Sequence, residues 1–219
     1  MNKWQEFISE KRMPLNFVLF YTVGLVLFAL PLTRVFFNAI TAATLLLVIA
    51  IVFYFHKEWN IKILICFALI IVSSFLLEMV GVSTGKLFGT YIYDSSLGLK
   101  LYDTPLIIGF NWLFLVYASQ DIAGRISQNS FLKILIGAGL MVLYDLVLEL
   151  VAPVMHMWHF NTFYPPLANF VIWFIAAALF HTLFVCAKIK INNRPARMLF
   201  WVQMGFFALI SLYRLIFLL

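Results

Sequence analysis

Residues 61–80 read IKILICFALIIVSSFLLEMV, an apolar stretch interrupted by one lysine near its start, two serines and a glutamate, Glu78, near its end. About 20 apolar residues give an α-helix the length that it needs to cross the hydrocarbon core of a bilayer. The stretch therefore predicts a membrane-spanning helix that carries a carboxyl group toward one membrane face. The rest of the chain repeats this pattern of long apolar runs with few polar residues.

Composition agrees with a membrane environment for the whole chain of 219 residues. Hydrophobic residues make up 64% and charged residues 11%, and the mean hydropathy is +1.02. A soluble domain is about half apolar and about a quarter charged, so lipid must contact much of this surface. We expect a single integral membrane domain over residues 1–219, in a bacterial inner (cytoplasmic) membrane, with the lipid bilayer as a partner and no nucleic acid.

The predicted fold class is all-α, a polytopic membrane helical bundle of about seven transmembrane helices. The apolar run over 15–33 exceeds the roughly 7–15 residues of a signal-peptide core, so it is predicted to be a retained first helix. Two polar connectors, 81–103 and 152–165, separate some of the spans. The predicted spans are 15–33, 35–55, 61–80, 104–119, 131–151, 166–187 and 198–219.

The loop charges predict the orientation. With seven spans, most of the 15 lysines and arginines, Lys3 among them, fall on the side of the N-terminus. The four that fall on the opposite side are Arg34, Lys86, Lys100 and Arg214. Because positively charged loops stay in the cytoplasm, we expect a cytoplasmic N-terminus and place both polar connectors outside.

On this topology three carboxyl groups gather in the outer half of the bundle. Glu78 ends the third span, and Asp145 and Glu149 lie four residues apart on one face of the fifth. Carboxylates at such a depth are candidate functional groups, and crowding favours the neutral form of at least one. A neutral acid beside an ionised one combines a proton donor with an acceptor. The structural alternative is that Glu78 and Glu149 are helix-end residues that reach interfacial water, whereas a structural Asp145 needs a partner on another helix.

Aromatic and amide side chains are predicted to share this region. Asn111 and Trp112 begin the fourth span, Asn169 and Trp173 begin the sixth, and Trp158 lies in the second connector. Indole faces stabilise cations through the ring quadrupole, although interfacial belts of aromatic residues are common as well. The amides would orient an acid or a water molecule.

The histidines and cysteines do not predict a metal site. His156 and His159 are expected at the membrane interface, and His181 in a structural position near the inner side. Cys66 and Cys186 both fall inside apolar spans, which favours neither a disulfide framework nor a thiolate metal centre. Arg214, near the outer end of the last span, would pair with one of the carboxylates or extend to the interface.

Two motifs carry a resemblance to a known family. The first reads EMVGVSTGKLFGTYIY over residues 78–93, with an Asn-Trp pair at 111–112. The second is Asp145-x-x-x-Glu149, then Trp158 and YPPLANFVIW over residues 164–173. The region 78–173 resembles the membrane carotenoid-biosynthesis family that includes the carotenoid 1,2-hydratases and bisanhydrobacterioruberin hydratase.

The resemblance implies an enzyme, a carbon–oxygen lyase that adds water to the terminal carbon–carbon double bond of an acyclic carotenoid, with no cofactor and no metal. Asp145 would donate the proton, Glu149 or Glu78 would handle water, and Trp112 and Trp173 would stabilise the tertiary cation. The expected substrate-binding residues are Asn111, Trp112, Trp158, Asn169, Trp173, Tyr91 and Tyr93. Other enzymes of the pathway are possible partners.

Three other functions fit the same residues. A carotenoid cyclase begins with the same protonation but loses a proton instead of gaining water. A membrane transporter also uses intramembrane carboxylates, although the sequence contains no internal repeat of the kind that many transporters carry. A non-catalytic scaffold for pigment enzymes is the third alternative.

Overall fold

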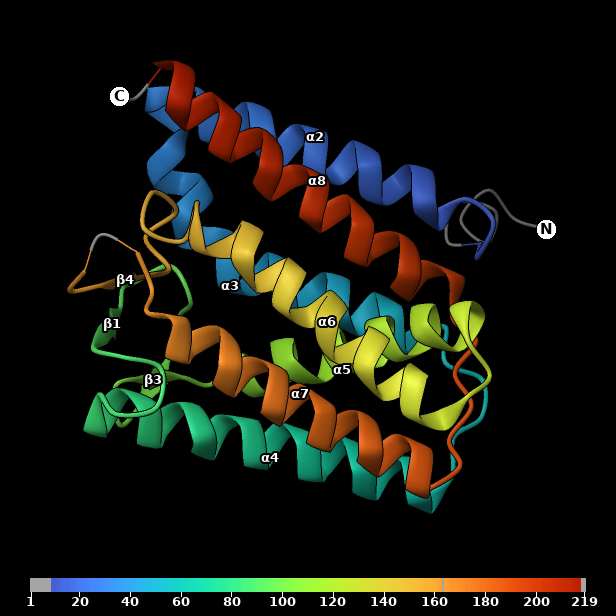
Figure 1. The fold of residues 1–219 in the computed structure, drawn as a ribbon. Coiled ribbons are helices and arrows are strands. Elements are labelled where there is room, and N and C mark those ends of the chain that lie inside the picture. The colour runs from blue at the N-terminus through green and yellow to red at the C-terminus, as the bar shows by residue number, and fades with distance from the viewer. Residues whose placement is uncertain (1–8, 163, 218–219) are drawn as a thin grey trace.

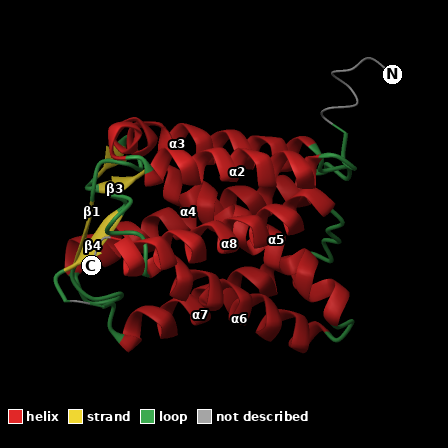
Figure 2. Cartoon of the chain, turned by 90° about the horizontal axis from the view of Figure 1, so that it is seen from above, coloured by secondary structure: helices red, strands yellow, loops and turns green. Residues whose placement is uncertain are grey.

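The computed structural model describes residues 9–162 and 164–217. In this part of the chain, seven helices lie side by side along one direction (Figure 1, Figure 2). They are α2 (Met13–Ala29), α3 (Pro31–Tyr54), α4 (Ile61–Thr84), α5 (Ile107–Ile126), α6 (Ser130–Glu149), α7 (Leu167–Cys186) and α8 (Arg194–Phe217). Lys3 and the last two residues of the predicted span 198–219 lie outside the described residues.

Five helices of the described chain are long and apolar enough to cross a membrane, which confirms a helical bundle of an integral membrane protein. They are α3, α4, α6, α7 and α8. The 17-residue α2 is apolar but shorter, and the buried α5 is not among the five. Seven crossings and the cytoplasmic N-terminus therefore stay predictions.

Helix α5 lies at the centre of the bundle, where it contacts α3, α4, α6, α7 and α8. The sequence predicted that this span ends at Ser119, before the charged Asp121. The structure corrects this boundary, because α5 continues to Ile126 with Asp121 buried inside the protein. A helix surrounded by other helices needs less apolar surface than one that faces lipid.

The ends of α4 and α6 follow from local sequence. The side chains of Asn60 and Asn129 accept hydrogen bonds from the backbone N–H groups of Ile63 and Leu132, which caps the two helices. Gly85 ends α4 with φ of +63°, a left-handed conformation that glycine adopts without strain. The chain therefore turns sharply after Glu78 and directs the first connector back over the bundle.

Four short strands that the sequence did not predict lie in the two connectors and at Thr104–Pro105, where the fourth span was predicted to begin. In the antiparallel sheet at one end of the bundle, β1 (Tyr91–Tyr93) pairs with β4 (Trp158–Phe160), and Tyr93 lies opposite Trp158 (Figure 1). A smaller hairpin joins β2 (Lys100–Leu101) to β3 (Thr104–Pro105). Alternation along β1 turns Tyr91 and Tyr93 inward and leaves Ile92 exposed. The first connector thus folds back into the bundle, and both connectors lie at the same end, as predicted.

Candidate active site

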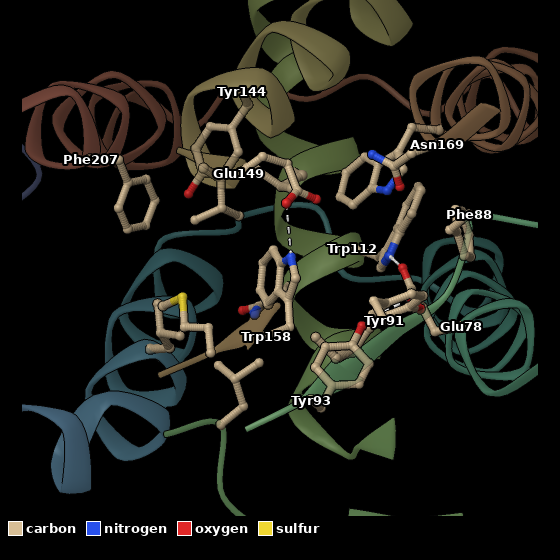
Figure 3. Close-up of a pocket in the computed structure, with 18 of the residues that line it drawn as sticks. Glu78, Phe88, Tyr91, Tyr93, Trp112, Tyr144, Glu149, Trp158, Asn169 and Phe207 are labelled. Atoms are coloured by element: carbon tan, nitrogen blue, oxygen red, sulfur yellow. Dashed lines mark hydrogen bonds between the residues drawn. The ribbon is translucent and has the colours of Figure 1, made fainter. Parts of the chain in front are cut away.

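A cavity of about 60 Å³ lies beneath the β1–β4 sheet, between the ends of the helices (Figure 3). We call it the carboxylate cavity. It is lined by the predicted site residues Glu78, Tyr91, Tyr93, Asn111, Trp112, Glu149, Trp158, Asn169 and Trp173. The remaining walls are mainly apolar, and this volume has room for a few water molecules. The structure therefore brings together all the predicted site residues except Asp145, which does not line the cavity.

Glu78 accepts three hydrogen bonds inside the bundle. The Tyr91 and Tyr93 hydroxyls donate to its Oε2 atom at 2.6 and 2.9 Å, and the Trp112 Nε1–H donates to its Oε1 atom at 3.0 Å (Figure 3). An ionised carboxyl group has only acceptor sites, and both of its oxygens are used here as acceptors. Glu78 is thus held in a fixed position and is more than a helix-end residue that reaches interfacial water.

The two tyrosines of β1 are suited to remain hydrogen-bond donors. Burial, and then the neighbouring Glu78 carboxyl, raise the pKa of both phenols well above its ordinary value. Each hydroxyl therefore keeps its proton over the whole physiological range. The sheet supplies Glu78 with two permanently neutral donors.

Glu149 lies at the C-terminal end of α6 and accepts one hydrogen bond, from the Trp158 Nε1–H at 3.1 Å. It also lines a second, outward pocket of about 380 Å³, the outer pocket, together with Tyr164, Ser211 and Arg214. The carboxyl group therefore lies between the carboxylate cavity and a surface pocket. It is buried, yet it borders both the interior and the outer pocket, the side on which one sequence alternative expected contact with water.

Asp145 is fully buried, one helical turn from Glu149. The Asn169 Nδ2–H of α7 donates to its Oδ2 atom at 2.9 Å, which is the interhelical partner that a structural Asp145 requires. Its Oδ1 atom, however, is buried with no hydrogen-bond partner among the described residues. An unsatisfied buried oxygen is costly, so the hydrogen bond from Asn169 alone does not account for the burial of both oxygens of Asp145.

The two predicted cation-stabilising tryptophans form one aromatic wall. The rings of Trp112 and Trp173 stack with their centroids 4.1 Å apart and an interplanar angle of 26°. Both side chains are buried and both line the cavity. Trp112 and Trp173 therefore do not belong to an exposed interfacial belt. They form a polarisable wall beside the carboxyl groups.

None of the three carboxyl groups forms an ion pair within residues 9–162 and 164–217. Arg214, one predicted partner, instead donates to the Leu150 carbonyl oxygen at 3.1 Å and is half-buried. No group of histidines, cysteines and acids that could hold a metal occurs in the described chain. His159 contacts Asp94 at the exposed rim, and His181 is buried against Ser119 and Gln120.

The sequence analysis missed a hydrogen-bonded chain on the opposite wall. The Tyr144 hydroxyl donates to Gln203 Oε1 at 2.8 Å, and Gln203 Nε2–H donates to the Tyr21 hydroxyl at 2.6 Å. Tyr144 and Gln203 line the cavity, so this chain connects it with α2. A glutamine inside the last apolar span was the signal that could have identified it, because polar side chains at that depth are costly.

Comparisons with known proteins identify the family. Searches of curated proteins and of solved structures gave no match. A family model described as "carotenoid biosynthesis protein" matches residues 37–218, which include every residue that lines the carboxylate cavity. Since the match covers most of the chain, this protein belongs to the family of carotenoid biosynthesis proteins.

Proposed function

We propose that this protein is a carotenoid hydratase that adds water to the terminal double bond of an acyclic carotenoid. The observation that carries the proposal is the position of Glu149, which lines both the largely apolar carboxylate cavity and the outer pocket, whose wall also includes His159 and Arg214. One side suits a hydrocarbon end group and the other admits water. Family membership supports the pathway, and the site supports the reaction type.

The reaction begins with the transfer of a proton from a carboxyl group to the less substituted alkene carbon. Positive charge then develops on the tertiary carbon, a water oxygen bonds to it, and the proton that this water loses returns to a carboxylate. The net change is the addition of one water molecule, with no oxidation or reduction. General acid–base catalysis of this kind needs a donor within hydrogen-bonding reach of the reacting atom.

Among the three carboxyl groups, Glu149 is the donor that the geometry favours. The sequence analysis gave this role to Asp145, which lies behind the cavity wall and would act through Glu149 or Asn169. Neighbouring carboxyl groups in a site without a cation are expected to share a proton rather than both ionise. Asp145 would thus support the protonation of Glu149 as a positioning residue.

Glu78 and the stacked Trp112 and Trp173 would stabilise the developing cation. Three donors hold Glu78 as a fixed acceptor, so its charge would lie close to the reacting end group. The Trp112–Trp173 wall would add the attraction of an aromatic face for positive charge. Preorganised groups that stabilise transition-state charge commonly supply the largest part of catalysis.

A cyclase is the second candidate, because it shares the protonation step. It would need to exclude water from the cation, whereas the outer pocket of about 380 Å³ reaches Glu149 from the protein surface. Water access therefore favours hydration over proton loss.

Expression in a lycopene-accumulating bacterium tests the proposal. We expect pigments whose mass has increased by one water per modified end, with the protein confirmed in the membrane. A Glu149→Gln variant should yield none, and the exposed Asp103→Asn variant should serve as an active control. Pigment of unchanged mass but altered absorption would indicate the cyclase, and unmodified lycopene would contradict both.

A further inference from the structure

A second cavity of about 90 Å³ lies between α2, α3 and α8. It is lined by Phe20, Tyr21, Val23, Gly24, Leu27, Phe37, Ile40, Thr41, Thr44, Leu45, Met155, Met157, Phe206 and Phe207. Nearly all of these side chains are hydrocarbon, aromatic or thioether groups. The cavity therefore offers an apolar ligand extensive contact.

The second cavity adjoins the carboxylate cavity. Leu45, Met157 and Phe207 line both, so the same three side chains contact whatever occupies either space. The hydrogen bond from Gln203 to Tyr21 also joins a wall of one cavity to a wall of the other. The two cavities are thus neighbours on either side of Leu45, Met157 and Phe207.

The few polar groups around the second cavity are already satisfied by the protein. The Thr41 hydroxyl donates to the Phe37 carbonyl oxygen at 3.0 Å, and the Thr44 hydroxyl donates to that of Thr41 at 2.9 Å. The Tyr21 hydroxyl accepts its hydrogen bond from Gln203. A polar ligand would gain little here, because no charged residue lines the cavity and each of these hydroxyls has an internal partner.

One side of the cavity lies at the apolar outer surface of the bundle. Phe20 and Val23 of α2 line it while 37% and 58% exposed, respectively. A hydrophobic molecule dissolved in the bilayer can therefore approach between α2 and α3 without crossing a polar surface. The two polar connectors, in contrast, cover the end of the bundle.

We propose that this second cavity binds the polyene chain next to the reacting end group, and that the substrate enters from the bilayer between α2 and α3. The proposal rests on the proposed function, since it takes the carotenoid as the ligand. It separates the roles of three spaces: the second cavity takes hydrocarbon, the carboxylate cavity takes the end group, and the outer pocket takes water. The rest of the polyene would extend into the lipid.

Gly24 offers a way to fill the cavity from α2. A Cβ atom built there lies 3.6 Å from ring atoms of Phe37 and Phe206, so alanine fits, whereas phenylalanine would occupy the space of the ligand. Replacing a helical glycine does not weaken the helix itself. Ile40→Trp fills the same cavity from α3, and Val26→Phe on the lipid-facing side of α2 is the matched control.

The test is the amount of polyene that remains bound to each detergent-purified variant expressed in a lycopene-accumulating bacterium, measured by visible absorption per protein. We expect Gly24→Phe and Ile40→Trp to retain about tenfold less pigment than the parent protein, because apolar contacts are lost. Gly24→Ala and Val26→Phe should retain the parental amount. Elution as an intact monodisperse protein checks that each variant is folded.

The readout counts pigment whatever its end group, so it does not depend on hydration. Retention that follows this pattern without any water-added product would uphold the binding site and contradict the hydratase. Parental retention in both filled variants, or no pigment on the parent protein, would overturn the site. Loss of a bound phospholipid with unchanged pigment would also overturn it, by showing that a lipid chain occupies the cavity.

Discussion

Buried carboxyl groups occur at both ends of this bundle, and their surroundings differ. At the end away from the sheet, Asp121 binds Arg197 at 2.5 Å, lies 3.7 Å from Arg125 and accepts the Asn193 backbone N–H at 2.7 Å. At the sheet end, Glu78, Asp145 and Glu149 receive hydrogen bonds from neutral donors alone.

The difference separates a structural acid from candidate reactive ones. Asp121 is neutralised by cations and joins α5 to the start of α8, where Asn193 extends the connection to the Val52 carbonyl oxygen of α3. The acids at the sheet end form no ion pair with any described residue, and they surround or adjoin a cavity. A buried acid without a cation is costly, so its presence beside an open cavity indicates that the protein uses it for more than folding.

The comparison predicts that Glu149→Gln causes the largest loss of activity. Removing a general acid typically costs about 10²- to 10⁴-fold in rate, and glutamine keeps the shape and the hydrogen bond from Trp158. The hydration rate in purified membranes, normalised to folded protein, provides the measurement. Asp145→Asn should cost less, and a complete loss in that variant with activity retained in Glu149→Gln would move the donor role back to Asp145.

At the opposite end, Arg197→Met should affect stability rather than chemistry. Breaking a buried ion pair leaves an uncompensated charge and costs about 3–5 kcal/mol, which thermal unfolding in detergent measures. The half-exposed Arg125→Met is the matched control and should cost about 1 kcal/mol or less. The hydration rate per folded Arg197→Met molecule should stay at the parental level. A loss of rate without a loss of stability would contradict the assignment of a purely structural role to Asp121.

A smaller effect is expected when Glu149 loses its donor. Trp158→Phe removes the hydrogen bond that would stabilise the Glu149 carboxylate as its proton leaves. A bond to a charged group is worth about 1.5–3 kcal/mol, so we expect kcat to fall about tenfold or more with KM little changed. The exposed Trp201→Phe on α8 is the control. An equal fall in both variants would assign the loss to general destabilisation.

The smallest change is expected at Glu78, which has three donors. Tyr93→Phe removes one of them and should slow hydration by only a few-fold, because Tyr91 and Trp112 still donate to the carboxyl group. Because burial raises the pKa of both Tyr91 and Tyr93, neither should add an alkaline limb to the rate profile of the parent protein below about pH 10. An alkaline limb in the parent protein that disappears in Tyr93→Phe would contradict this expectation. The exposed Tyr102→Phe variant is the control, and its rate profile should equal that of the parent protein.

Hydropathy predicted the bundle well because long apolar runs leave few alternatives in a chain of this composition. The grouping of Glu78, Glu149 and the tryptophans also followed, since alternating spans place them at one end. The extent of α5 did not follow, because Asp121 is compensated by Arg197, 76 positions later. The hydropathy of the residues around Asp121 does not indicate an ion-pair partner so far along the chain.

The finer geometry of the site was also beyond the sequence. Asp145 and Glu149 lie one turn apart on the same face of α6. Glu149 lines the cavity, whereas Asp145 is fully buried behind its wall. Strand β1 has three residues, too few to give a periodic signal. The connection from Tyr144 through Gln203 to Tyr21 joins three helices and depends on their packing.

The pairing of β1 with β4 has a further consequence for the two glutamates. Tyr93 and Trp158 are directly opposite each other in the ladder, and one donates to Glu78 while the other donates to Glu149. The strand register therefore fixes the positions of the two donors relative to each other, and through them the relative positions of Glu78 on α4 and Glu149 on α6. A slip of one strand by one residue would turn its donor to the opposite face, so the hydrogen bond to that glutamate is expected to be gained or lost in a single step.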